Sequence, residues 1–389
     1  MIGFELSEEQ KALQQKARKF AIEEMIPVSR KHDLSGEFPW EVAQKAWESG
    51  LLNTQIPKKY GGSEMSLLEA CLIVEEMAAA DPGMATSLYA NNLGAEPIIL
   101  AGTDEQKKKF LTPLTETLSF ISFATSEPSM GSDVAGIQTE AVKVEGGYEL
   151  NGRKFWITNA PVADHIVVFA TLDKKLKHKG IISLVVPAKT EGVKIGKPME
   201  KMGHRASPTS FVKLENVFIP EKNRLGNEGQ GFLIAMKTFS QTRPAIGAFA
   251  TGVARGAMEY ALNYSKKRTA FGTQISNFQA IQFKIADIYK NLEAARLLTW
   301  KAAWEADNGL DNTITASIAK AFGSDIAMAA TTEAIQIFGG FGYTKNYLVE
   351  KLFRDAKLYQ IYEGTSEIQR MVISRHVLEN YKPVFEKIY

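Results

Sequence analysis

The sequence predicts an α+β fold of three consecutive domains, helical, β and helical, and two observations carry this prediction. Apolar spacing is helical up to about residue 118, changes to short β-branched runs between 119 and 228, and is helical again from 229 to 389. A chain of 389 residues is long enough for two or three domains with their own cores. We therefore predict an N-terminal all-helical domain (1–118), a middle β-barrel-like domain (119–228) and a C-terminal four-helix bundle (229–389).

The first domain is expected to be helical because its apolar residues recur at helical spacing. Leu6, Leu13, Ala17 and Phe20 form one stripe, and residues 67–80 are nearly all apolar, which predicts a buried helix. Glycine and proline at 61–62 and 81–83 separate these segments.

The middle domain is expected to hold at least five strands. β-branched runs predict strands at 141–144, 155–158, 165–171, 181–186 and 211–219, and Gly146-Gly147 and Asn151-Gly152 are interpreted as turns. The basic run 174–179 is expected to be a solvated hairpin tip, and the glycine-rich segment 226–231 a turn into the third domain.

Long helical segments at 278–306 and 313–338 dominate the last domain and favour a bundle. Helices, a β domain and helices in this order leave a crevice where a planar cofactor could lie. No Gly-x-Gly-x-x-Gly motif opens a helix after a strand and no Walker loop is present, so a Rossmann or P-loop nucleotide site is not expected.

Composition excludes several classes of protein. A net charge of +2 gives no reason to expect a nucleic-acid partner, and no apolar run is long enough for stable membrane insertion. The five histidines are too scattered to form a metal site, and the single Cys71, in an apolar run, is expected to be a buried thiol in a reducing compartment. The first residues lack a basic lead into an apolar segment, so we expect a cytoplasmic protein or a trimmed mitochondrial-matrix form.

A short stretch near the C-terminus, residues 362–370 (YEGTSEIQR), places one carboxylate, Glu363, directly before a helix. Gly364 permits close backbone approach to a ligand, and Ser366 with Gln369 is typical of a capping box. A carboxylate beside the free N–H groups of a helix start suits proton abstraction next to an anion or oxyanion. By itself the stretch is equally typical of a helix-entry loop whose glutamate faces water. The helix is expected to continue with an apolar face of Ile368, Met371, Val372 and Val377.

Four further segments carry a family resemblance. Residues 336–343 (QIFGGFGY) and 354–357 (RDAK) precede the Glu363 loop, and residues 126–133 (SEPSMGSD) and 155–159 (FWITN) lie in the middle of the chain. In order and separation these segments resemble the acyl-CoA dehydrogenases over essentially the whole chain. The sequence is most similar to the medium-chain and short-chain members.

The resemblance implies FAD-dependent α,β-dehydrogenation of an acyl-CoA thioester to the trans-2-enoyl-CoA. Glu363 would abstract the α-proton, flavin N5 would take the β-hydride, and electrons would pass to electron-transfer flavoprotein. The enolate oxygen would meet the backbone N–H of Glu363 and a flavin ribityl hydroxyl. Because an enclosed carboxylate loses hydration, its pKa is expected to rise, mainly when ligand is bound. A homotetramer built as a dimer of dimers is also implied.

Site residues follow from the same resemblance. Those implied to bind FAD within one subunit are Phe123, Thr125, Ser126, Ser132, Trp156, Ile157, Thr158, Thr365 and Glu367, although relatives often carry Gln or Asn in place of Glu367. Those implied to reach the FAD of a neighbouring subunit are Arg268, Phe271, Phe278, Gln279, Gln336, Gly339 and Gly340.

The substrate is expected to contact a second set of residues. By resemblance these are Ser132, Ser240, Arg243, Tyr89, Ile246, Tyr362 and Gly364, with Thr86 and Leu93 also lining the acyl cavity. Ser240 stands where some relatives have Asp, which leaves one CoA contact open. Tyr89 replaces a smaller or acidic residue, so a short- to medium-chain straight acyl group is favoured.

Alternatives to this prediction remain. A branched or cyclic acyl-CoA could be the substrate, because the bulk of Tyr89 could also shape the cavity for a ring. An acyl-CoA oxidase would use the same base and flavin with oxygen as acceptor, but the chain has only the dehydrogenase's length. A noncatalytic flavin-binding relative would be expected to lose Glu363 or Arg243, and both are present.

Overall fold

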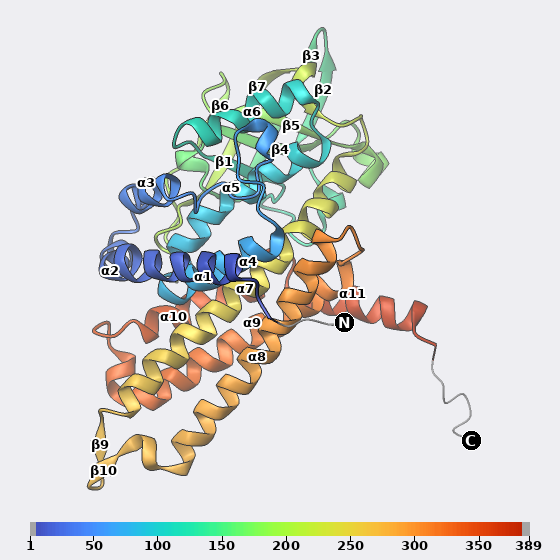
Figure 1. Cartoon of the computed structure of the whole chain (residues 1–389). Helices are drawn as coiled ribbons and strands as arrows, with labels where there is room; N and C mark the ends of the chain where they lie inside the picture. The colour runs from blue at the N-terminus through green and yellow to red at the C-terminus, as the bar shows by residue number, and fades with distance from the viewer. Residues whose placement is uncertain (1–4, 383–389) are drawn as a thin grey trace.

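The computed structural model describes residues 5–382 and begins with a helical domain (Figure 1). Ser7 and Ser66 begin α1 and α4 with capping boxes, and Asp81 caps α5. The predicted buried helix at 67–80 is confirmed as α4. The helices of this domain are α1 (Glu8–Phe20), α2 (Ile26–Ser35), α3 (Trp40–Glu48), α4 (Leu67–Ala80), α5 (Pro82–Ala101) and α6 (Asp104–Glu116), with a π-helical turn at Ala21–Met25 before α2.

The middle of the chain forms one eight-stranded sheet in the order β6-β7-β3-β2-β4-β5-β8, with β1 paired in parallel to β4. All five predicted strands are confirmed, and β1, β6 and β8 are additional. The bounds are β1 (Ile121–Ala124), β2 (Glu140–Val144), β3 (Gly147–Thr158), β4 (His165–Thr171), β5 (Ile181–Pro187), β6 (Val193–Ile195), β7 (Thr209–Pro220) and β8 (Arg224–Leu225).

The predicted turn at Asn151-Gly152 is wrong, because both residues lie inside β3. The register against β7 shifts between Leu150 and Gly152, so the pair marks a bulge. A Cβ on Gly152 would lie 2.7 Å from the Cα of Thr139, which explains the glycine by close packing of two backbones.

The C-terminal domain is helical, as predicted. Its long helices α7, α8 and α9 lie side by side in the lower part of Figure 1, and α4 of the first domain packs along α7. The helices are α7 (Gly231–Ser265), α8 (Gln279–Asp307), α9 (Thr313–Phe338), α10 (Val349–Ala356) and α11 (Ser366–Asn380), and a small hairpin, β9 (Thr269–Ala270) with β10 (Thr273–Gln274), lies between α7 and α8.

The predicted apolar face of α11 packs inside the chain only in part, with Ile368 and Val372 half-buried where the helix lies against α9. Met371 and Val377 are 55% and 47% exposed, and the helix extends away from the bundle in Figure 1. The helical spacing noted towards Tyr389 continues into residues 383–389, which lie outside the described residues. None of the helices within residues 5–382 has both the length and the apolar character needed to cross a bilayer.

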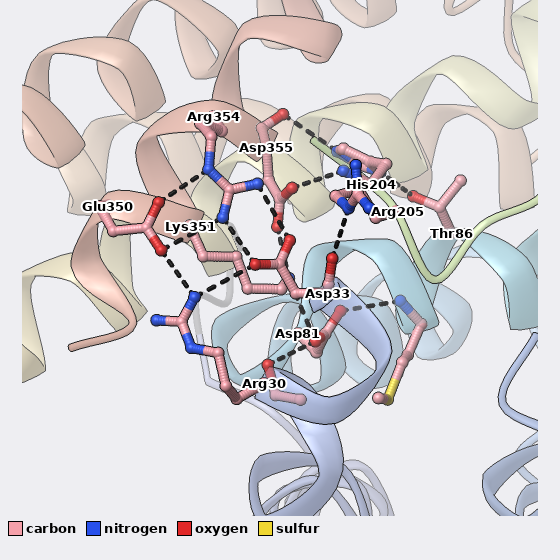
Figure 2. Close-up of polar contacts among 12 residues, drawn as sticks. Arg30, Asp33, Asp81, Thr86, His204, Arg205, Glu350, Lys351, Arg354 and Asp355 are labelled. Carbon is pink, nitrogen blue, oxygen red and sulfur yellow. Dashed lines mark hydrogen bonds and ion pairs between the residues drawn. The ribbon is translucent and has the colours of Figure 1, made fainter. Parts of the chain in front are cut away.

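A buried network of charges joins the three domains at α10 (Figure 2). Lys351 on α10 pairs with Asp355 at 2.6 Å and with Asp81, the cap of α5, at 3.1 Å. Arg354 pairs with Asp33 of α2 at 2.7 Å, and the middle-domain His204 donates its backbone N–H to Asp355 at 2.5 Å. The network therefore fixes α10, whose C-terminal end leads into the Glu363 loop.

Candidate active site

The Glu363 loop follows α10 and a short 3-10 turn, and it lies against α7 and α9. Thr242 of α7 donates its hydroxyl to the Glu363 carboxylate at 2.9 Å. Glu363 and Gly364 both have left-handed backbone angles, with φ of 52° and 88°. Such a conformation is costly for a non-glycine residue and is common at functional sites, so the surrounding contacts hold Glu363 in a strained position.

Electrostatics prepare this carboxylate to act as a base. Burial raises the pKa of Glu363 to about 7, against the opposing effects of the Thr242 hydrogen bond and the charges of Arg243 and Lys320. The expected rise in the pKa of Glu363 is thus present already without ligand. A general base is most effective when its pKa lies near the working pH.

Side chains from two helices hold the carbonyl groups of the loop. Gln369 donates to the carbonyls of Glu363 and Gly364 at 3.1 and 3.0 Å, and Lys320 donates to that of Gly364 at 2.6 Å. The predicted capping box of Ser366 with Gln369 is wrong: Thr365 caps α11 by accepting from the N–H of Ile368, which leaves Gln369 free to hold the loop. Within residues 5–382 the N–H groups of Glu363 and Gly364 have no hydrogen-bond acceptor, so they are free to meet an oxyanion.

The predicted ring-facing residues gather on the middle domain at the end of β3. The backbone N–H of Phe155 donates to the carbonyl of Ser126 at 2.9 Å, which joins the two segments. The register of β3 shifts between Lys154 and Ile157, and Trp156 has a φ of 62°. Trp156 is consequently turned outward and is 59% exposed, whereas Ile157 is buried, so only the backbone of Ile157 can face a cofactor.

A buried ion pair fixes these two segments relative to each other. Lys154 pairs with Glu127 at 2.7 Å and also donates to the carbonyl of Thr125 at 3.0 Å. Glu127 in turn accepts from the backbone and the hydroxyl of Thr139. Phe123 on β1 and Thr158 at the end of β3 are half-buried, and Ser132 is exposed in the loop after β1.

Residues predicted to contact substrate line the interior next to the base. Arg243 and Ile246 are buried on α7, Ser240 is half-buried one turn before Arg243, and Thr86 and Tyr89 are buried on α5. Aromatic rings connect the two sides: Tyr89 packs on Phe249 at 5.6 Å, Phe249 on Tyr359 at 5.9 Å, and Tyr359 on Tyr362 at 5.7 Å. Tyr89 also borders a cavity of about 10 Å³ between α4 and α5.

A second group of predicted cofactor residues lies elsewhere, at the far end of the bundle (Figure 1). Phe271 and Gly272 form the tip of the β9–β10 hairpin, where Phe271 is 97% exposed, and the Arg268 guanidinium lies 5.8 Å from the Phe341 ring. Arg268 follows Arg243 by 25 residues along α7 and its end, which corresponds to about 37 Å at 1.5 Å per residue. One chain therefore does not bring this group to Glu363. The other members, Phe278, Gln279, Gln336, Gly339 and Gly340, flank the same end, and all except the half-buried Phe278 are exposed.

The site also holds buried polar atoms that the described chain does not satisfy. Of nine such side-chain atoms, four lie in residues 359–369: the hydroxyls of Tyr359, Tyr362 and Ser366, and the Gln369 carbonyl oxygen. Buried polar groups normally have partners. The exposed tryptophan on the bulged strand suits a planar cofactor. The free N–H groups and the unpaired polar atoms suit a polar substrate. The residues described contain no cluster of potential metal ligands.

Sequence reasoning missed Thr242 and Lys320, although weak signals for both existed. Thr242 directly precedes the predicted Arg243 on α7. Lys320 interrupts the apolar run Ile318-Ala319-Lys320-Ala321 and is completely buried, and a buried lysine needs a specific partner.

Comparison with known proteins identifies this arrangement. The N-terminal, middle and C-terminal domains of the acyl-CoA dehydrogenases match residues 7–117, 122–217 and 229–378. A probable acyl-CoA dehydrogenase of Bacillus subtilis is 43% identical, covering 97% of this chain and 100% of that protein. The caffeyl-CoA reductase-Etf complex subunit CarC of Acetobacterium woodii is 40% identical over 96% and 99%. The structure of butyryl-CoA dehydrogenase from Megasphaera elsdenii superposes with a TM-score of 0.94 at 40% identity, covering 97% and 100%.

This fold and these matches define a flavin-dependent oxidoreductase that acts on a CH–CH bond. The chain belongs to the acyl-CoA dehydrogenase family, and its cofactor is FAD.

Proposed function

We propose that this enzyme dehydrogenates a short- to medium-chain straight acyl-CoA thioester, with Glu363 as the base that removes the α-proton. The observation that carries the proposal is the position of Glu363: its carboxylate is held by Thr242 beside two free backbone N–H groups, and its pKa lies at about 7. A weakly acidic C–H requires both a placed base and stabilisation of the developing enolate.

The chain's own residues have separable roles in this scheme. The free N–H of Glu363 would donate to the thioester oxygen as negative charge develops there, and the carboxylate would receive the α-proton. Thr125, Ser126, Thr158 and the outward-facing Trp156 would hold the FAD, which accepts the β-hydride when bound. Arg243, buried next to the loop, would orient the CoA arm, and Ser132 would lie between the cofactor and that arm.

The acyl preference rests on Tyr89, whose buried ring ends the aromatic row from the base. We expect Tyr89→Ala to open the cavity that this ring borders. The ratio of kcat/KM for octanoyl-CoA to that for butyryl-CoA should then rise at least ~10-fold. Each additional methylene that the enlarged cavity can bury contributes about 1–3 kcal/mol to transition-state binding. Tyr89→Phe, which keeps the ring, serves as the control. If Tyr89→Ala kept the parent's dependence on chain length, Tyr89 would not line the acyl cavity.

A substrate carrying a ring is the second candidate. One relative is named as a subunit of a caffeyl-CoA reductase-Etf complex, and the aromatic row from Tyr89 to Tyr362 would pack well against an aryl group. Comparing 3-phenylpropionyl-CoA with butyryl-CoA under identical conditions decides between the two. A higher kcat/KM for the aryl substrate would replace the straight-chain proposal.

The distant group around Arg268 supports assembly into a homotetramer of two dimers, each copy contributing to its neighbour's FAD site. Arg268→Ala is therefore expected to weaken FAD retention, because loss of one member of a charge-assisted pair typically costs on the order of 2–5 kcal/mol. Gel filtration with absorbance at 280 and ~450 nm reports both assembly and flavin content. Arg375→Ala, which removes an exposed arginine of α11, is the control. A monomer that keeps tightly bound FAD would contradict the shared site.

The electron acceptor is proposed to be electron-transfer flavoprotein, since the Acetobacterium woodii relative is named as a subunit of a complex with it. Steady-state turnover with butyryl-CoA should reduce that protein much faster than it produces hydrogen peroxide in air. Equal rates with oxygen would favour the oxidase alternative.

A further inference from the structure

Lys320 is a buried lysine that the proposed reaction does not use. It lies on α9 and is 0% exposed. Within residues 5–382 the only hydrogen-bond acceptor of its side-chain ammonium is the Gly364 carbonyl, at 2.6 Å. The other fully buried lysines, Lys154 and Lys351, each pair directly with a carboxylate. Lys320 has no such ion pair in the described chain, and burial lowers its pKa to about 8.

The contact has a geometric consequence for the catalytic loop. Glu363 and Gly364 are both left-handed, and their two carbonyls are held by Gln369, by Lys320 and, at 3.5 Å, by Arg243. A peptide's N–H and C=O point in opposite directions, so fixing the carbonyl of Glu363 also fixes the N–H of Gly364. Lys320 therefore helps to hold a pair of residues that would otherwise relax from a costly conformation.

The contact also has an electrostatic consequence. The carboxylate whose charge most favours the protonated form of Lys320 is Glu363, one residue before the carbonyl that Lys320 holds. Charges facing Glu363 come from Arg243 on α7 and Lys320 on α9, while Tyr89 on α5 is uncharged. Asp325 and the exposed Glu367 act on Lys320 more weakly.

We propose that Lys320 is a positioning residue for the base: it fixes the Glu363-Gly364 loop through the Gly364 carbonyl and adds its positive charge to that of Arg243 beside the carboxylate. This inference rests on the proposed function of Glu363. It assigns a role to a buried residue that the proposed reaction leaves unused.

The test is the pH dependence of flavin reduction by butyryl-CoA in anaerobic stopped flow, for the FAD-loaded enzyme and for Lys320→Met. The parent rate should rise with pH through about 7, because Glu363 acts only when ionised. In Lys320→Met the rise should move to higher pH, so that the rate at pH 7 falls roughly 3- to 10-fold and the difference from the parent shrinks as the pH increases. The plateau should stay below the parent's, because the Gly364 carbonyl also loses a donor. FAD content and melting temperature verify that each variant is folded.

Gln369→Met is the matched comparison, because it removes a neutral donor from the same carbonyls. It should lower the rate at every pH without moving the midpoint. If Lys320→Met does not fold, Lys320→Gln, which keeps an N–H donor without the charge, should show the same displaced midpoint. A midpoint equal to the parent's in the folded Lys320 variant overturns the proposal. Failure of the parent enzyme to reduce its flavin would instead overturn the proposed function.

Discussion

Replacing Glu363 by glutamine is expected to abolish flavin reduction by acyl-CoA while leaving fold, assembly and FAD content intact. Glutamine has nearly the same volume and can keep the hydrogen bond with Thr242, so packing changes little. Loss of a general base alone costs about 10²–10⁴ in rate, and here hydride departure depends on the same proton transfer. Anaerobic stopped flow at the flavin absorbance band measures the effect.

Binding should survive this change. Acyl-CoA should still perturb the flavin spectrum of Glu363→Gln, because Arg243 and the aromatic row are untouched. Glu116→Gln, on the exposed last turn of α6, is the control and should keep a rate close to the parent's. Near-parental reduction in Glu363→Gln would mean that a different carboxylate is the base.

The second large effect is expected at Lys351, the centre of the charge network in Figure 2. Lys351→Met leaves Asp81 and Asp355 buried without their shared cation. Removing one member of a buried ion pair typically destabilises a protein by about 3–5 kcal/mol. Thermal unfolding should show a large decrease in melting temperature, and FAD retention should fall with it because α10 no longer fixes the Glu363 loop.

The control for this variant is Lys59→Met, the same substitution in an exposed ion pair. Lys59 and Asp104 have side chains 64% and 65% exposed, so solvent screens their attraction and little change in melting temperature is expected. Equal melting temperatures for Lys351→Met and Lys59→Met would show that the network contributes nothing to the joining of the three domains.

Much of the fold could be predicted because the spacing of apolar residues along the sequence shows which face of a helix or strand is buried. The all-apolar run of α4 and the long helices α8 and α9 gave clear patterns, and the predicted range of α9 matches the observed helix. Strands β6 and β8 have three and two residues, too few for a pattern. The turn predicted at Asn151-Gly152 was wrong because both turns and close backbone packing favour glycine. The two causes can be told apart only from the folded structure, where the Thr139 backbone lies against Gly152.

The site was predictable in its chemistry but not in its supporting contacts. Glu363 stands out as a carboxylate before a helix, whereas Thr242 and Lys320 are separated from it by 121 and 43 positions and meet it only in the folded chain. The capping prediction failed because serine and threonine are both good helix caps and stand next to each other at 365 and 366. The bulge that turns Trp156 outward depends on pairing with β7, which local sequence does not contain.

The most direct test of the account is an anaerobic titration of the yellow FAD-loaded protein with butyryl-CoA, octanoyl-CoA and 3-phenylpropionyl-CoA, followed at the flavin band. The account predicts that butyryl-CoA and octanoyl-CoA bleach the flavin, with enoyl-CoA formed in equal amount to the flavin reduced. Binding-induced spectral shifts without bleaching by any acyl-CoA would contradict it, because an intact base and cofactor would then be present without dehydrogenation.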